Sequence, residues 1–586
     1  MRVFIDRFAR WLEITPHRVW MILAGLMLSA AAFAATGDNA IANSEIAVPL
    51  WLTGIALMII GCWKTNPPQE HKRWDRWEIA IILALTLSSL FLRTWGADNM
   101  PYVLSGDEGS AGLTAWEFLD GRRSNILGLG WFSFPSLYFW LLSLSQQVLG
   151  RTVIAIRWVS ALAGALTIPA LYWACRSLFN RRVALLSAAW LMAFHHHIFF
   201  SRVAYNNIWD GLFFVLALGA LWNAWEFNNR RSFLLAGLAL GFAQYFYTTS
   251  RLIPILLALW MIWLARRGEG WKSRLPGILC MVLAALSVSL PLVLLYLRHP
   301  ESLFFTASRV SMLIPGWIGP AAEALGTTPV GLVFEQIWVT ALGLTVAETQ
   351  GVYFGSGIPM LIGASAWIFS IGLIYCAIRF REARYGLILI TILTILLVGG
   401  LSIQAPNGQR MLFLSPILAI LIASTLDGMY AFINGRWPLL KPVAAVCISL
   451  LIILMVGENI RHLFLDYFPT ENYGSLNGEV TQEIFELLEV EPPQTSLFFT
   501  GGDRMSVHSI PSLAYLLPDA HTYDLPPPYD LPHDYSPQGP FTLFAILPEE
   551  TAAFEEITSS YADGITQPRY NRHGRLLFYL YRVENK

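Results

Sequence analysis

Long apolar runs separated by short polar stretches occupy the chain up to about residue 457. A transmembrane helix needs about 20 predominantly apolar residues, and fourteen segments approach that length. They lie approximately at 19–36, 45–63, 78–95, 134–149, 153–175, 183–200, 208–226, 233–249, 252–265, 276–297, 359–380, 385–403, 411–428 and 440–457. No small-residue cleavage pattern separates the first two, so we expect the first to be retained. The pattern predicts a mainly α, polytopic membrane protein.

The orientation follows from the basic residues, because short loops rich in Lys and Arg stay in the cytoplasm. Such clusters lie at 2–18, 64–76, 176–182, 230–231, 266–274, 379–384 and 436–441. All of them can be cytoplasmic only if one apolar segment does not cross. Segment 134–149 is short, begins Phe134-Pro135 and contains Gln146-Gln147, so we expect it to be re-entrant or to lie in the interface. About thirteen crossings of the cell membrane then remain, with the N-terminus on the cytoplasmic side and the C-terminus on the outer side.

This topology predicts three large pieces on the outer face: loop 96–133, loop 298–358 and the tail from about 458. It divides the chain into two additional N-terminal helices (1–77), a membrane domain (78–457) and a C-terminal extracytoplasmic domain (458–586). The tail has strand-like runs at 496–500, 541–547 and 576–583, with a helical pattern through Ser559, which predicts a small α/β domain. Loop 298–358 is amphipathic, as suits a segment lying over a lipid chain or packing against the tail.

Composition supports a membrane protein and excludes some partners. Of 586 residues 55% are hydrophobic and 13% charged, whereas soluble domains carry about 25% charged residues. The net charge of −1 leaves no basic face for nucleic acid. The five cysteines lie in or beside apolar segments without metal-ligand spacing, so neither a disulfide framework nor a zinc site is expected. We expect no metal and no cofactor.

The adjacent acidic pair Asp107-Glu108, flanked by glycines in the first outer loop, is the most unusual feature. A carboxylate at the membrane surface could take the proton from an acceptor hydroxyl, and the glycines would let substrate approach the backbone. Alternatively, Asp107 caps a helix that begins near Gly109. The two roles are compatible.

Other candidates gather at the outer ends of the predicted helices. Isolated arginines there could meet phosphate oxygens with two parallel donors, or could simply snorkel to the head groups. Nearby Asn, Asp and Tyr side chains could bind sugar hydroxyls, cap a helix or line the same pocket. These candidate substrate-binding residues are Arg202, Arg251, Arg410, Tyr205, Asn206, Asp210 and Tyr247. Residues 195–197 are consecutive histidines that point about 100° apart around a helix, so they cannot converge on one metal.

The order of short motifs resembles the GT-C glycosyltransferases, specifically the protein O-mannosyltransferase and aminoarabinose-transferase-like group (glycosyltransferase family 39-like). The acidic pair of the first outer loop is followed by Phe134-Pro135 with Leu137-Tyr138, by Arg157 opening a span, by Phe179 to Arg182, and by Phe200-Ser201-Arg202. The resemblance covers roughly residues 78 to 300. The chain departs from the family pattern in having two spans before the matching region and Ser133-Phe134 where the family has His or Pro before its Pro.

The resemblance implies a glycosyltransferase that takes a sugar from a polyprenyl-phosphate-linked donor, with inversion and with Asp107 as general base. Glu108 would then orient the acceptor or support Asp107. The chain has no Asp-x-Asp pair, the metal grip typical of enzymes that use nucleotide sugars. The acceptor could be a protein, a glycan or a lipid.

Two other classes of protein fit parts of the pattern. A polytopic transporter or lipid flippase would also have many spans, but such proteins usually carry ionisable groups near the bilayer midplane and repeated halves. The span centres here are nearly free of charge, and no repeat is evident. A non-catalytic assembly protein, in which Asp107 and Glu108 are structural, also fits the pattern.

Overall fold

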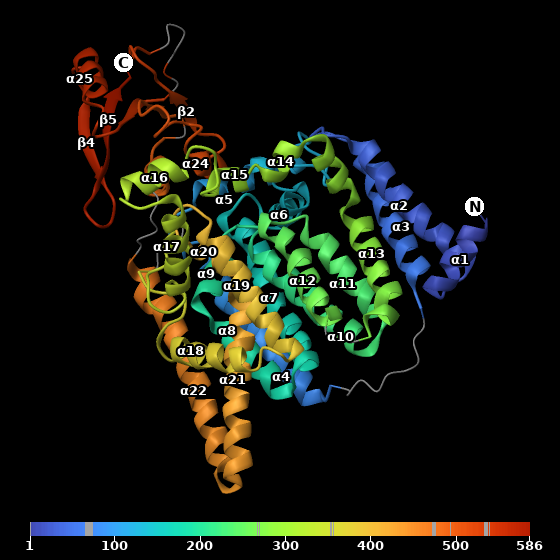
Figure 1. The fold of residues 1–586 in the computed structure, drawn as a ribbon. Helices are drawn as coiled ribbons and strands as arrows, with labels where there is room; N and C mark the ends of the chain where they lie inside the picture. The colour runs from blue at the N-terminus through green and yellow to red at the C-terminus, as the bar shows by residue number, and fades with distance from the viewer. Residues whose placement is uncertain are drawn as a thin grey trace.

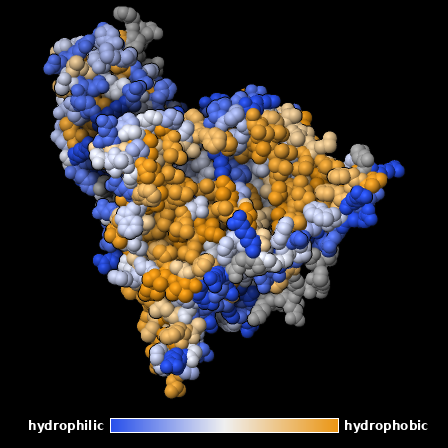
Figure 2. All heavy atoms as spheres, viewed as in Figure 1, coloured by the Kyte–Doolittle hydropathy of each residue, from blue (hydrophilic) through white to orange (hydrophobic). Residues whose placement is uncertain are grey.

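The computed structural model describes residues 2–64, 74–266, 268, 270–351, 354, 357–470, 476–492, 494–531, 537 and 539–585. Within these ranges, every apolar segment expected from the sequence forms a helix. Ten helices are long and apolar enough to cross a membrane. They contain α2 (Pro16–Thr36), α3 (Ser44–Cys62), α4 (Arg76–Thr94), α7 (Val153–Leu178), α10 (Ile208–Phe227), α12 (Leu252–Arg266), α13 (Trp271–Arg298), α19 (Ala383–Gly400), α21 (Ser415–Arg436) and α22 (Lys441–Arg461). Three of these spans include adjoining helical turns, so that the spans of α12, α21 and α22 run over Thr248–Arg266, Gly408–Arg436 and Pro438–Thr470. The protein is a multi-pass membrane protein, and Figure 2 shows apolar residues over the middle of the helical body on the face in view.

Four predicted segments form shorter or bent helices. Helices α8 (Arg181–Ala193) and α9 (His195–Ser201) meet at an angle of 60° and count together as one span. Helices α6 (Ser136–Leu149), α11 (Arg230–Ala243) and α18 (Gly363–Ile378) have only 14, 14 and 16 residues. Length and composition therefore support ten or eleven spans among the described residues. The expected number of thirteen would require two further crossings by helices of these shorter lengths.

The two loops predicted to lie on the outer face, 96–133 and 298–358, both contain helices. The first contains α5 (Gly106–Leu119), and the second contains α14 (Pro300–Phe304), α15 (Ala307–Val310), α16 (Ile318–Ala324) and α17 (Pro329–Leu342). The apolar helix α17 was not anticipated. It lies against α19, where a side chain on Gly400 would collide with Ile337. A short helix, α20 (Gly408–Met411), precedes α21.

The tail domain follows the last membrane helix, which continues through helical turns as far as Thr470. Its elements are α23 (Leu476–Val490), β1 (Ser496–Phe499), α24 (Pro511–Leu516), β2 (His521–Asp524), β3 (Phe541–Ile546), α25 (Thr551–Ser560), β4 (Ile565–Tyr570) and β5 (Leu576–Glu584). The sheet order is β2-β1-β3-β5-β4, with β1 parallel to both neighbours and β5 antiparallel to both of its own. The small α/β domain predicted from the three strand-like runs is confirmed.

The N-terminal helices pack on the side of the body formed by α11 and α13 (Figure 1). An amphipathic helix, α1 (Arg2–Leu12), precedes the two expected spans. The link between α2 and α3 reaches the first outer loop, where the backbone N–H groups of Ser124 and Asn125 both donate to Ala40 O at 3.0 Å. The same link reaches the second outer loop, where Asp38 pairs with Arg298 and His299.

Candidate active site

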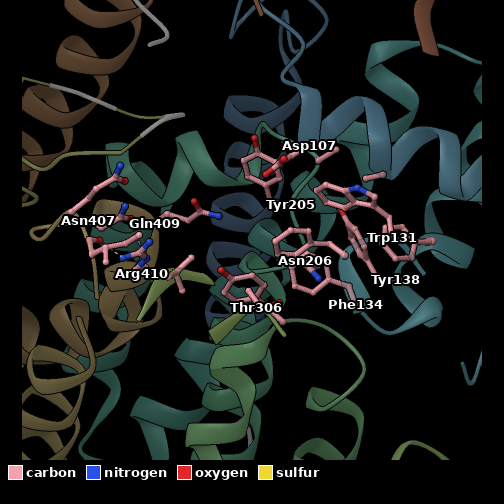
Figure 3. Close-up of a pocket in the computed structure, with 18 residues that line it drawn as sticks. Asp107, Trp131, Phe134, Tyr138, Tyr205, Asn206, Thr306, Asn407, Gln409 and Arg410 are labelled. Carbon is pink, nitrogen blue, oxygen red and sulfur yellow. Dashed lines mark hydrogen bonds between the residues drawn. The ribbon is translucent and has the colours of Figure 1, made fainter. Parts of the chain in front are cut away.

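A cavity is lined by residues of α5, α15 and α20 (Figure 3). These helices lie toward the end of the helical body that carries the tail domain (Figure 1). The volume of the cavity is about 260 Å³, close to the lower end of the usual range for small-ligand pockets. Its walls come from α5, from the two outer loops, from the link between α9 and α10, and from the segment before α20. The lining residues are Asp107, Ala111, Trp131, Phe132, Phe134, Tyr138, Phe139, Ala204, Tyr205, Asn206, Tyr247, Thr306, Val310, Ile403, Gln404, Asn407, Gln409 and Arg410.

Asp107 enters the cavity from the first turn of α5. The N-cap of this helix is Ser105, whose hydroxyl accepts from the Glu108 N–H at 3.2 Å, while the Glu108 carboxylate accepts from the Ser105 N–H at 3.1 Å. This reciprocal capping box closes the start of the helix. Asp107 is therefore not the cap, and the alternative assignment made from the sequence is corrected. The N-terminal end of a helix favours an ionised carboxylate.

Glu108 lies behind the cavity wall, fully buried against Arg157 of α7. The guanidinium Nε of Arg157 lies 2.8 Å from Glu108 Oε1, which also accepts from the Ala204 N–H at 2.9 Å. Arg157 further donates to the carbonyls of Ala97, Pro101 and Val103, in the loop that leads to α5. Because breaking a buried pair of this kind costs about 3–5 kcal/mol, the pair holds α5, its loop and the 204–206 link in one arrangement. Glu108 was expected either to orient the acceptor or to support Asp107; its carboxylate does not line the cavity, so its position fits the supporting role.

The candidates Tyr205, Asn206 and Tyr247 line the cavity, whereas Asp210 lies behind Tyr247. Tyr205 Oη lies 2.7 Å from Ser105 Oγ, and Asn206 Nδ2 donates to Phe246 O at 3.0 Å. The Tyr247 hydroxyl can donate a hydrogen bond to a ligand in the cavity. Asp210 does not reach the cavity; it accepts from the Tyr247 N–H at 3.4 Å and from the Thr249 hydroxyl.

The three candidate arginines have different surroundings. Arg410 lines the cavity and donates to Ile403 O. Arg202 is buried and donates to the carbonyls of Met100, Leu92 and Trp95 at 2.7–2.9 Å. Arg251 donates to Leu303 O and to Tyr296 Oη. Of the three candidate phosphate-binding arginines, Arg410 lines the cavity, and Arg202 and Arg251 lie outside it.

The consecutive histidines also lie away from the cavity, inside the body. His195 Nδ1 lies 2.6 Å from Asn459 Oδ1, and His197 Nδ1 lies 2.8 Å from Arg93 Nη2. Within the part of the chain that the structure describes, no three His, Cys, Asp or Glu side chains gather where they could share a metal ion.

Sequence reasoning missed much of the cavity wall. Polar side chains come from Thr306, Gln404, Asn407 and Gln409, and an aromatic wall comes from residues 131–139. Asn407 has a local signal, because it caps α20 by accepting from the Arg410 N–H. The aromatic residues resemble an interfacial belt in the sequence, and only their convergence on Asp107 distinguishes them (Figure 3).

Comparison with known families gives a partial match in sequence. Residues 133–294 match the model for dolichyl-phosphate-mannose-protein mannosyltransferase. The undecaprenyl phosphate-alpha-4-amino-4-deoxy-L-arabinose arabinosyl transferase 2 of Pseudomonas fluorescens is 32% identical over 189 residues, which cover 31% of this chain and 31% of that protein. The corresponding transferase of Pseudomonas aeruginosa is 33% identical over 180 residues, 29% of this chain and 32% of that protein. The chain thus spans about a third of the length of these curated relatives.

Similarity to solved structures extends over most of the chain. The crystal structure of ArnT from Cupriavidus metallidurans bound to undecaprenyl phosphate aligns with a TM-score of 0.54 and 15% identity, over 86% of this chain and 96% of that one. The apo oligosaccharyltransferase of Archaeoglobus fulgidus aligns with a TM-score of 0.50 and 13% identity, over 86% of this chain and 74% of that one. At such low identity these similarities establish the fold.

Proposed function

We propose that this chain, whose fold is that of the GT-C glycosyltransferases, transfers a sugar from a polyprenyl-phosphate-linked donor to an acceptor on the outer face of the membrane. The observation that carries the proposal is that Asp107 and Arg410 line one cavity from different sides (Figure 3). A base and a fixed cation on either side of a sugar are what displacement of a phosphate from an anomeric carbon requires. The transferases named in the comparison use a donor of this kind.

In the proposed reaction Asp107 accepts the proton of the acceptor hydroxyl while the hydroxyl oxygen forms a bond to the anomeric carbon. The bond from that carbon to the phosphate oxygen breaks, and the electron pair leaves with the polyprenyl phosphate. Arg410 neutralises the charge that develops on this phosphate. Attack from the face opposite the leaving group inverts the anomeric configuration.

The remaining cavity residues bind and orient the sugar. Tyr205, Asn206 and Tyr247 offer hydrogen-bonding groups, and the aromatic wall offers stacking faces. Glu108 and Arg157 act through α5, by fixing the direction from which Asp107 enters.

The topology supports an outer-face reaction. The cavity and the tail domain lie at one end of the body, and the hairpin between α21 and α22 with its basic turn lies at the other (Figure 1). Basic loops mark the cytoplasmic side, so we place the tail domain outside the cell. The acceptor is a protein, a glycan or a lipid. The relatives named in the comparison are transferases, so the alternative of a transporter or flippase is not favoured.

The direct test is transfer of labelled sugar from synthetic polyprenyl-phosphate donors by purified protein. Asp107→Asn should lower kcat by about 10²–10⁴-fold, because the general base is lost while the shape of the side chain is kept. Asp98→Asn, which alters an exposed carboxylate of the same outer loop, is the matched control and should keep full turnover. Undiminished transfer by Asp107→Asn would remove the proposed base.

A further inference from the structure

The helix that carries Asp107 is held from behind by the tail domain. Asp107 and Ala111, four residues apart, face the cavity. Gly109 lies about 200° around the helix axis from Asp107, at 100° per residue, and Gly106 and Gly112 flank it. The glycines therefore form the face of α5 opposite the cavity.

Helix α24 of the tail domain occupies that opposite face. A methyl group on Gly109 would collide with the backbone of Ser512, and one on Gly112 would lie 2.6 Å from Cε2 of Tyr515. Only glycine admits such a close approach. The glycines that flank the acidic pair were expected to admit substrate to the backbone, but at Gly109 the close approach is made by α24.

Helix α24 is in turn fixed to the membrane domain by the turn between α6 and α7. Arg151 donates to Tyr515 O at 2.8 Å and to Ala514 O at 2.6 Å. Its guanidinium carbon lies 5.2 Å from the ring centre of Trp116 and 5.4 Å from that of Tyr515. The Tyr515 hydroxyl donates to Thr152 O at 3.0 Å. Arg151 therefore binds carbonyls at the C-terminal end of α24, where a cation is favoured.

The tail domain makes a second contact, with the loop that leads into α5. Tyr102 donates to Glu486 Oε1 at 3.0 Å, and the guanidinium of Arg572 lies 4.0 Å from the centre of the Tyr102 ring. The tail domain thus contacts both the approach to α5 and the rear of its first turns.

From this arrangement we infer that the tail domain is a positioning element of the reaction centre: Tyr515, packed against Gly112, sets how far α5 projects Asp107 into the cavity. The inference rests on the proposed transferase function and deepens it. Tyr515 touches neither the cavity nor the reacting atoms and acts through α5. A small retreat of α5 would withdraw the carboxylate, and a misplacement of about 1 Å can cost about 10²-fold in rate.

The test is a double-mutant cycle on the full-length protein in detergent or nanodiscs. Gly112→Ala and Tyr515→Ala should each lower kcat by about ten- to a hundredfold, with the donor KM changed less than about twofold, since the cavity wall remains. The double variant should lose no more than either single one, because the methyl group added to α5 then meets no ring. Tyr515→Phe, which keeps the ring, should retain most of the turnover.

Hydrogen exchange gives a readout independent of catalysis. The amides of α5 should exchange faster in Gly112→Ala and in Tyr515→Ala than in the unaltered protein. Gly319→Ala in α16, where a methyl group meets open space, and Tyr570→Ala, at a half-exposed ring of β4, are the matched controls and should change neither readout. If a cycle variant does not fold, Arg151→Met, which leaves α5 itself unaltered, should reproduce the loss in kcat.

The two proposals fail in different ways. Additive losses in the cycle, a loss expressed in KM, or unchanged α5 exchange in Tyr515→Ala would overturn the positioning role while leaving the transferase intact. Absence of sugar transfer by the unaltered protein, with α5 exchange still dependent on Tyr515, would overturn the proposed reaction alone.

Discussion

At the scale of single residues, side chains of the same type have different roles because they contact different partners. Arg202, Arg251 and Arg410 look alike in sequence, each isolated at the outer end of an apolar segment. The Arg202 guanidinium donates to three backbone carbonyls and stacks against Phe464 and Phe468. Arg410 reaches the cavity because α20 begins with the Asn407 cap and turns the next residues toward Asp107.

Substitution of Arg410 should therefore affect turnover, whereas substitution of Arg202 should affect stability. Arg410→Gln should lower kcat by about 10²-fold through lost stabilisation of the leaving phosphate, while the melting temperature in detergent changes little. Arg202→Gln should lower the free energy of unfolding by about 2–5 kcal/mol, since it strands buried carbonyls. Kinetics and thermal unfolding of both variants, measured side by side, check this. A kinetic loss in folded Arg202→Gln equal to that of Arg410→Gln would contradict the separation.

At the scale of elements, the link between α2 and α3 joins the two outer loops that wall the cavity. It contacts residues 124–125 through backbone hydrogen bonds and the start of the second outer loop through Asp38. The two additional N-terminal spans are thus connected, through this link, to both loops that line the cavity, and we call this connection the brace.

This brace should depend on pH. Hydrogen bonding to His299 lowers the pKa of Asp38, and hydrogen bonding to Asp38 raises the pKa of His299. The contribution of His299 to the stability of this contact is complete below its ordinary pKa of 6.5 and is lost as pH rises through the raised pKa. The contribution of Asp38 is complete above its ordinary pKa of 3.8 and is lost as pH falls through the lowered pKa. Exchange protection of amides in 38–46, corrected for intrinsic rates, should be higher at pH 6 than at pH 9. Asp38→Asn should flatten this difference, and a pH effect that persists in the variant would assign it to other groups.

At the scale of the whole molecule, the question is which end of the body faces the cytoplasm. The proposed donor chemistry requires the cavity and the tail domain to be outside. Position 269, a natural choice for a cytoplasmic probe, lies outside the described residues, but Lys272 at the start of α13 is exposed and described.

Single cysteines introduced into a chain with its five native cysteines replaced should settle the orientation. Asp563→Cys, in the tail domain, should react with an impermeant maleimide added to intact cells, and Lys272→Cys should react only in inverted vesicles. The same pair of variants serves as mutual control for reagent quality and expression. If position 272 were labelled from outside while position 563 stayed protected, the orientation would be the opposite of the proposed one. The argument for a lipid donor at the outer face would then be lost.

The sequence by itself determined what depends on local composition and period. Apolar runs long enough for a bilayer became helices, strand-like runs in the tail became β1, β3 and β5, and the Asp107-Glu108 pair marked the start of α5. These features follow from hydrophobic burial and backbone hydrogen bonding within each segment. Only the tertiary structure decided which polar side chains share a cavity, why Glu108 turns to Arg157 while Asp107 turns to the ligand space, and that α24 lies against the glycines of α5. Those outcomes depend on contacts between residues up to about 400 positions apart, which no local pattern encodes.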